Sequence, residues 1–133
     1  MEQGTRKGEA PLSDEQSVHL DEQGSLARVG QDHELLCELY EAFSQDAPLK
    51  LASLEGAVRN ADISGIVESA HSLKGASAAI GAEHCRGLAE SLEMAGHAED
   101  LAQAPELFRL VSSEVALVLS LVSERIAAYS SQA

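Results

Sequence analysis

The segment from residue 63 to residue 80 sets the architecture of the chain and reads ISGIVESAHSLKGASAAI. Apolar and small residues recur in it at steps of three and four, which is the period of one face of an α-helix. This stripe consists of Ile63, Ile66, Ala70, Leu73, Ser77 and Ile80. Asp62 precedes the segment as a good N-cap residue, and Gly81 follows it as a helix stop. We therefore expect one helix here, with the stripe turned toward a core.

Segments on both sides of residues 63–80 repeat this helical period. Upstream, a short helix is expected from Asp21 to Gly30, followed by a long helix from about residue 32 to a turn at residues 60–62. Downstream, a helix is expected from residue 82 to Ala95, ended by Gly96, and a last helix starts near residues 104–105, because proline suits a first turn. The inward residues of these four helices are expected to be Leu26 and Val29; Leu36, Leu39, Phe43, Ala47, Leu51, Leu54 and Val58; Cys85, Leu88, Leu92 and Ala95; and Leu107, Val111, Val115, Val118, Val122 and Ile126.

Four long helices with short connections predict an all-α fold, an antiparallel up-and-down four-helix bundle with a short extra N-terminal helix. No segment shows the sustained apolar–polar alternation of a half-buried strand. Pro48 lies inside the long helix and predicts either a bend or a break there, because proline removes a backbone donor. We expect residues 1–19 to be a flexible tail and residues 20–130 to form the bundle domain.

The composition excludes several classes of protein. The chain has 133 residues, 44% of them hydrophobic, which is enough for one domain with a core. Its net charge of −13 repels phosphate backbones, and aromatic residues are only 3%, so a nucleic-acid binder is not expected. Cys37 and Cys85 are too few for a disulfide framework. No apolar run approaches the roughly 20 residues that span a bilayer, and no signal segment is apparent, so we expect a soluble cytoplasmic protein without a membrane partner.

His71 lies on the side of the predicted helix that is turned away from the core. At about 100° per residue it falls roughly 130° from the centre of the stripe, so its ring is expected to point out of the bundle. The neighbouring outer-face positions are mostly small or uncharged, and they are Ser64, Val67, Glu68, Lys74, Gly75 and Ala78. A mid-helix glycine costs roughly 1 kcal/mol relative to alanine, and Gly75 removes a side chain beside the imidazole. Such an open face suits a nucleophile that must enter another protein's active site.

An exposed imidazole beside an ammonium group suits phosphoryl transfer. Neutral imidazole is a nucleophile near neutral pH, and attack by a ring nitrogen of His71 on a phosphoryl group would give a phosphohistidine. Lys74, three residues later, can offset the added negative charge. The chain has no G-x-x-x-x-G-K-[ST] motif or other glycine-rich nucleotide loop, so it is not expected to activate a phosphoryl donor by itself.

The segment AHSLKGASAAIGA, residues 70–82, closely resembles the signature of histidine-containing phosphotransfer (HPt) domains. The similarity continues at Leu88, Leu92, Glu93 and Gly96, and weakly upstream at Leu39, Phe43, Asp46, Ala47 and Pro48. It covers about residues 20–127. The combination H-S-L-K-G-x-S followed by G-A is far more specific than a lone histidine near a lysine.

The resemblance implies a phosphoryl carrier rather than an enzyme. HPt domains fold as antiparallel four-helix bundles and pass phosphoryl groups between receiver-domain aspartates in two-component phosphorelays, without ATP and without autonomous kinase or phosphatase activity. The implied partners are response-regulator receiver domains and a hybrid histidine kinase. No cofactor is expected, because the Mg²⁺ that the chemistry needs would lie in the receiver. A monomer is expected, since the face around His71 must stay free.

The resemblance also implies roles for single residues. His71 would be the phosphoacceptor, Lys74 would neighbour the phosphate, and Gly75 would keep the site open. Lys74 could otherwise be a solvated boundary residue, and Gly75 could serve close helix packing. We expect the docking face to centre on Val67, Gly75 and Ala78, with the next helix beside it.

Ser77, Glu93 and His97 are supporting candidates with competing interpretations. Ser77 matches a serine of the family signature, but its place on the stripe favours a hydrogen bond to the backbone one turn back. In relatives, Glu93 and His97 lie close to the phosphorylated histidine. The preferred interpretation of Glu93 is a solvated residue of the outer face, and His97 is expected to serve the dipole at a helix end rather than the chemistry. His97 stands where relatives commonly have arginine or lysine, and Cys85 where an apolar residue is usual. No H-x-x-x-H or C-x-x-C spacing is present, so no metal site is expected.

Two other classes of function compete with a phosphorelay carrier. A non-catalytic docking or inhibitory module would bind a receiver or a histidine kinase without chemistry, but it would have no need of the trio His71, Lys74 and Gly75. A structural four-helix adaptor would leave the open face around His71 without a purpose. Phosphoryl transfer through His71 is therefore the preferred interpretation.

Overall fold

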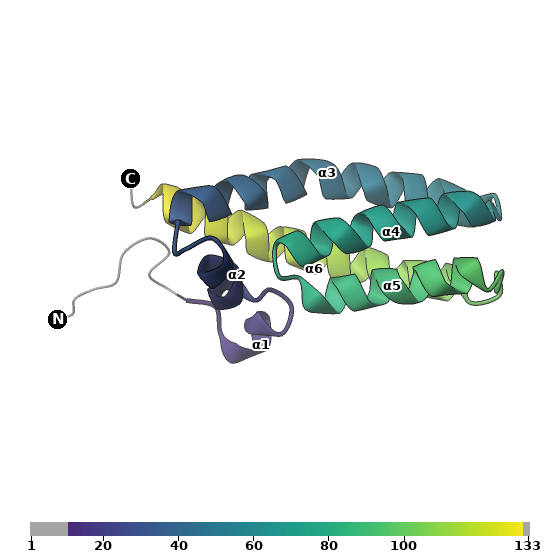
Figure 1. The fold of residues 1–133 in the computed structure, drawn as a ribbon, viewed down its shortest axis with the longest axis horizontal. Helices are drawn as coiled ribbons and strands as arrows, with labels where there is room; N and C mark the ends of the chain where they lie inside the picture. Colours follow the sequence, from purple (N-terminus) through teal and green to yellow (C-terminus); the bar gives the residue numbers. More distant parts are fainter. Residues whose placement is uncertain (1–10, 132–133) are drawn as a thin grey trace.

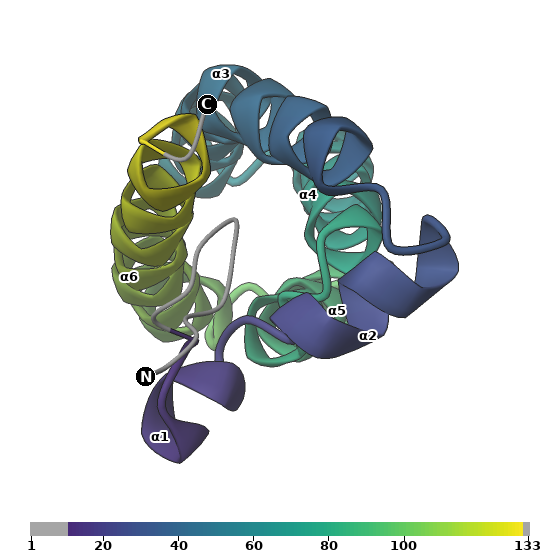
Figure 2. The same ribbon diagram turned by 90° about the vertical axis from the view of Figure 1, so that its left-hand side faces the viewer.

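The computed structural model describes residues 11–131 as a bundle of four long helices with two short helices at one end (Figure 1). The short helices are α1 (Asp14–Ser17) and α2 (Glu22–Arg28), and the long ones are α3 (His33–Arg59), α4 (Ile63–Ala79), α5 (Glu83–His97) and α6 (Ala104–Ser130). Consecutive long helices run antiparallel, and α6 closes the bundle against α3 (Figure 2). The predicted all-α, up-and-down four-helix bundle is confirmed.

The core of the bundle consists of the predicted stripes. Every residue of those stripes is buried or half-buried, and Tyr40 joins them with no exposed surface. Full burial of one aliphatic or aromatic side chain contributes about 1.5–3 kcal/mol, so these faces hold the four helices together and leave their outer faces available. Within residues 11–131, none of the helices has the length and apolar character needed to cross a membrane.

The helix ends follow the predicted cap residues. The side chains of Asp21, Asp32 and Asp62 each accept a hydrogen bond from the backbone N–H three residues later, at 2.9 to 3.0 Å. Gly81 follows α4 with a φ of +74°, a left-handed conformation that favours glycine. A Cβ at this position would lie 2.7 Å from Ser25 Oγ and 2.8 Å from the backbone oxygen of Asp21, so the glycine also lets α2 pack against the turn between α4 and α5.

The structure excludes one of the two alternatives at Pro48 and contradicts one prediction about a helix end. The break considered at Pro48 does not occur, because α3 is a single helix from His33 to Arg59. Ala47 and Leu54 are buried in the core on either side of the proline, and this packing offsets a loss of about 3 kcal/mol for proline within a helix. The prediction that Gly96 ends α5 is wrong. The helix continues to His97, and the left-handed residue that turns the chain is Glu99, with a φ of +57°.

The segment before α2 is more ordered than the predicted tail at residues 1–19. Residues 1–10 of that prediction lie outside the described residues. Ser13 caps the single turn of α1 with a capping box, in which its hydroxyl accepts from the Gln16 backbone N–H and the Gln16 side chain accepts from the Ser13 backbone N–H. His19 Nδ1 then lies 2.6 Å from Glu114 Oε2 on α6, which ties this segment to the bundle.

A buried polar cluster joins α2 to the end of α6. Glu22 Oε2 accepts hydrogen bonds from Arg125 Nε at 2.8 Å and from the Tyr129 hydroxyl at 2.6 Å. The guanidinium of Arg125 also lies 5.4 Å from the centre of the Tyr129 ring, in cation–π geometry. Buried charges are tolerated only when they are paired and hydrogen-bonded. The cluster therefore fixes α2 on the bundle, and the apolar stripes of the sequence do not predict it.

Helices α4 and α5 approach each other closely at Gly96. A Cβ at residue 96 would lie 2.8 Å from Val67 Cγ2 and 3.2 Å from Ile66 Cγ2. The first distance is too short for a real Cβ contact, and a β-branched neighbour has little freedom to move away. Gly96 is therefore a packing residue of the α4–α5 interface.

We predict that Gly96→Ala lowers the free energy of unfolding by about 1 kcal/mol, because overpacking typically costs about 1–3 kcal/mol and exceeds the gain in helix propensity. Gly87→Ala is the matched control on the same helix, since a Cβ there would meet no atom within 4 Å. It should leave stability unchanged or raise it. Urea unfolding followed by circular dichroism measures both variants, and equal stabilisation of the two would contradict close packing at Gly96.

Candidate functional site

Helix α4 presents the imidazole of His71 to solvent. The side chain is 67% exposed, whereas Ala70 and Leu73 on the opposite face of the helix have no exposed surface. Because these buried residues fix the rotation of α4 in the bundle, the direction of His71 is set by the core. The ring is therefore accessible to a partner, while the α4 backbone that carries it is held firmly in the bundle.

The carboxylate of Glu93, on α5, contacts three basic side chains. Its Oε2 atom lies 2.9 Å from His71 Nδ1, which is a hydrogen-bond distance, and 3.9 Å from His97 Nε2. Its Oε1 atom forms an ion pair with Lys74 Nζ at 2.8 Å. The Glu93 side chain is only 12% exposed, so this carboxylate lies at the α4–α5 interface beneath the exposed His71 ring.

The electrostatics of the site determine which nitrogen of His71 carries a proton. The Lys74 ammonium first, and then the hydrogen bond from His71, hold the pKa of the Glu93 carboxyl below its ordinary value, although partial burial opposes this. An ionised carboxylate can only accept hydrogen bonds, so His71 Nδ1 is the donor. In the neutral ring the other nitrogen, Nε2, then keeps its lone pair.

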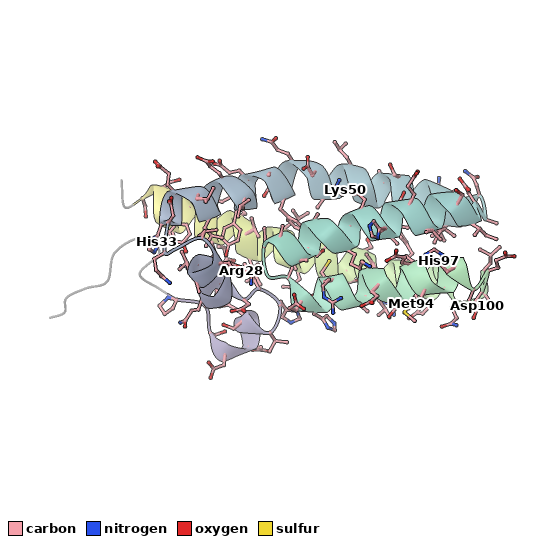
Figure 3. The ribbon with its side chains drawn as sticks, viewed as in Figure 1. Arg28, His33, Lys50, Met94, His97 and Asp100 are labelled. Carbon is pink, nitrogen blue, oxygen red and sulfur yellow. The ribbon has the colours of Figure 1, made fainter. Side chains whose placement is uncertain are left out.

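A groove of about 610 Å³ opens beside His71 between α4 and the end of α5. Its lining residues are Ile63, Ser64, Val67, Glu68, His71, Glu93, Gly96, His97 and Glu99. Figure 3 shows His97 near the end of α5, with Met94 and Asp100 in the same region of the bundle. The His97 side chain is 65% exposed. The groove is therefore lined by apolar residues, by carboxylates and by the two imidazoles of His71 and His97.

The approach to His71 along α4 is open. Gly75 is exposed, and a Cβ built on it would have no heavy atom within 4 Å. The alternative that Gly75 serves close helix packing is therefore wrong, because no neighbouring helix contacts that position. Ala78, one turn further, is also exposed, and Val67 is half-buried against Gly96.

Ser77 lies inside the bundle rather than beside the exposed ring. It has no exposed surface, and its hydroxyl donates to the Leu73 carbonyl oxygen at 2.9 Å, as its place on the stripe predicts. The same hydroxyl lies 3.2 Å from Cys85 Sγ, whose pKa is raised to about 11 by burial. Of the predicted site residues, the structure brings together His71, Lys74, Glu93 and His97 and leaves Ser77 in the core.

The central position of Glu93 is the feature that sequence reasoning underrates. The four-residue spacing of Glu93 and His97 is visible in the sequence, but the register of α5 against α4 is not. Gly96 is the signal that could have revealed it, because a glycine at the closest approach of two helices brings the preceding turn of α5 against α4. Among residues 11–131, no group of three or more His, Cys, Asp or Glu side chains is arranged to hold a metal ion.

Comparisons with known proteins agree with the helical-bundle fold. The family model described as the Hpt domain matches residues 38–126 of the chain. The crystal structure of histidine-containing phosphotransfer protein B (HptB) from Pseudomonas aeruginosa PAO1 is similar, with a TM-score of 0.78 and 28% sequence identity over 84% of this chain and 96% of that chain. No curated protein sequence matches the chain.

We predict that His71 carries its proton on Nδ1 in the neutral ring, because the Glu93 carboxylate accepts from that atom. Long-range ¹H–¹⁵N correlation spectra at about pH 8, where imidazoles are neutral, report the tautomer directly. In Glu93→Ala the ring should shift toward the Nε2–H tautomer, while the signals of the exposed His84 stay unchanged as a control. A wild-type His71 that is protonated on Nε2 would refute this assignment.

Proposed function

This chain belongs to the Hpt domain family, and on that premise we propose that it relays a phosphoryl group in a two-component phosphorelay through a phosphohistidine at His71. The observation that carries the proposal is the exposed His71 ring, whose Nδ1 lies 2.9 Å from the Glu93 carboxylate and whose Nε2 is left free. In this role the protein is a carrier without kinase or phosphatase activity of its own. Its proposed partners are response-regulator receiver domains and a hybrid histidine kinase in the cytoplasm.

In the first step, the lone pair of His71 Nε2 attacks the phosphorus of a receiver's aspartyl phosphate. The N–P bond forms as the P–O bond to the aspartate breaks, and the aspartate leaves as a carboxylate. The Mg²⁺ that assists this reaction would be bound by the receiver. The Nδ1 proton stays on the ring, and the positive charge that the ring gains is offset by the Glu93 carboxylate at 2.9 Å.

In the second step, the aspartate of another receiver attacks the phosphorus and the N–P bond breaks. His71 leaves as a neutral imidazole, because it has kept its proton on Nδ1 throughout. Lys74 supports both steps. Its ammonium group is paired with the Glu93 carboxylate and can offset negative charge on the phosphoryl oxygens. One fixed geometry therefore serves transfer in either direction, as a relay requires.

The proposed docking face centres on Val67, Gly75 and Ala78 together with the groove beside α5. Val67, Gly75 and Ala78 are small or apolar, so on their side of His71 a receiver's active site can approach Nε2 without a long side chain in between. A face of this kind favours transient contact, and a carrier must release each receiver after transfer.

The experiment that tests the proposal is transfer of ³²P from a phosphorylated receiver domain to this protein. The wild type should acquire label that is stable in alkali and labile in acid, whereas His71→Gln should acquire none. His84→Gln, which changes another exposed histidine, is the matched control and should be labelled like the wild type. Binding of a receiver without any transfer, tested over several receivers, would favour the docking module instead.

We also predict that Gly75→Gln reduces the rate of transfer at least tenfold while the fold stays intact, because its side chain would stand in the open approach to His71. Gly56→Gln on α3 is the control, since its Cβ would also meet no atom within 4 Å. Transfer rates come from quenched time courses, and circular dichroism reports the fold. Wild-type rates in a folded Gly75→Gln protein would show that the open face has no role in access.

A further inference from the structure

We propose that Lys50, on α3, is a docking residue that binds a carboxylate of the receiver domain while His71 exchanges the phosphoryl group. This inference rests on the proposed function, because it concerns the same partner and the same region of the bundle. It assigns to Lys50 a role in recognising and orienting the receiver, and no role in the chemistry.

A second groove, of about 300 Å³, lies between α3 and α4 on the other flank of the helix that carries His71. Its lining residues are Leu49, Lys50 and Ser53 from α3 and Glu68, Ser69 and Ser72 from α4. Ser72 directly follows His71 in the sequence, and Glu68 also lines the groove beside α5. The second groove therefore adjoins the proposed docking face and extends it from α4 toward α3.

Lys50 supplies this groove with a positive charge that no carboxylate neutralises. Among residues 11–131, Lys50 and Arg28 are the lysine and arginine side chains that form no ion pair with a carboxylate. The others are paired, and they are Arg59, Lys74, Arg86, Arg109 and Arg125. Lys50 is half-buried, and the chain has a net charge of −13. An unpaired ammonium group in so acidic a protein is available to a carboxylate of another protein.

The receiver domain presents the matching chemistry. The proposed reaction uses an aspartate of the receiver, and the Mg²⁺ that assists it would be held by carboxylates, which are ligands that Mg²⁺ prefers. On the α5 side of His71 the groove carries the exposed carboxylate of Glu99, whereas on the α3 side it carries Lys50. An acidic edge of the receiver is therefore favoured over α3, and this difference would fix the orientation in which the receiver docks.

The expected effect is on binding of the receiver rather than on the chemical step. A charged pair at the rim of an interface mainly changes the rate of association, and its loss weakens binding by about threefold. We therefore expect Lys50→Gln to raise the KM for the receiver about threefold. In Lys50→Glu, where repulsion replaces attraction, the increase should be about tenfold. The value of kcat should stay unchanged, because His71, Lys74 and Glu93 keep their contacts.

The test measures transfer of ³²P from a receiver domain, one that labels the wild type, over a series of receiver concentrations that give KM and kcat separately. Lys50→Arg keeps the charge and should behave like the wild type, whereas Lys50→Glu should show the higher KM. Arg28→Glu is the matched control, because it changes the net charge equally and Arg28 lies at the α2 end of the bundle, away from Lys50 (Figure 3). It should transfer like the wild type. The difference between the wild type and Lys50→Glu should shrink as salt is raised, since salt screens the pair.

An unchanged KM in Lys50→Glu would overturn the inference while leaving the proposed function intact. Equal increases of KM in Lys50→Glu and Arg28→Glu would also overturn it, because overall charge would then explain both. Phosphorylation by phosphoramidate, a small donor that needs no docking, should proceed in Lys50→Glu at the wild-type rate, and a slower rate would show a structural effect on His71 instead. Absence of label from the wild type, with phosphoramidate and with every receiver, would overturn the proposed function and this inference together.

Discussion

The close contact between α4 and α5 at Gly96 is the constraint on which the site depends. Gly96 packs against Val67 and Ile66 with no room for a Cβ, so the two helices approach at the turn that follows Glu93. This approach places the Glu93 carboxylate at the interface, 12% exposed, under an imidazole that is 67% exposed. The Glu93 carboxylate can thus orient the His71 ring through Nδ1, while the ring itself stays largely exposed to solvent.

The bundle separates the groups that stabilise the fold from those proposed to carry out the chemistry. At one end, the buried pair Glu22 and Arg125, with Tyr129, fixes α2 on α6. Along the outer face of α4 and α5, the Glu93 carboxylate accepts a hydrogen bond from His71 Nδ1 and forms an ion pair with Lys74. Because α4 is held by its apolar stripe and by the contact with Gly96, Gly75 and Ala78 on its outer face are free to remain small. The small residues of this open face therefore do not weaken the packing of the core.

The sequence predicts the bundle well, because helical periodicity, aspartate caps and Gly81 are local signals. Its stripe at 63–80 also predicts that His71 points outward and that Ser77 points inward, and the structure has both. It does not predict the central position of Glu93, which depends on the register of α5 against α4. It also misses the side-chain contacts of Glu22 and Glu114, since these join residues that are far apart in sequence. The sequence pattern predicts a helix end at Gly96, because a glycine that permits close packing looks the same in a single sequence as one that ends a helix.

The central claim is that Glu93 holds Nδ1 of His71 so that the phosphoryl group is carried on Nε2. The most direct measurement is the ³¹P–¹⁵N scalar coupling in a phosphorylated sample in which the histidines are labelled with ¹⁵N. A coupling between phosphorus and His71 Nε2, with Nδ1 still protonated, is the result that this account predicts. A coupling to Nδ1 of His71, or to a nitrogen of another histidine, would contradict it.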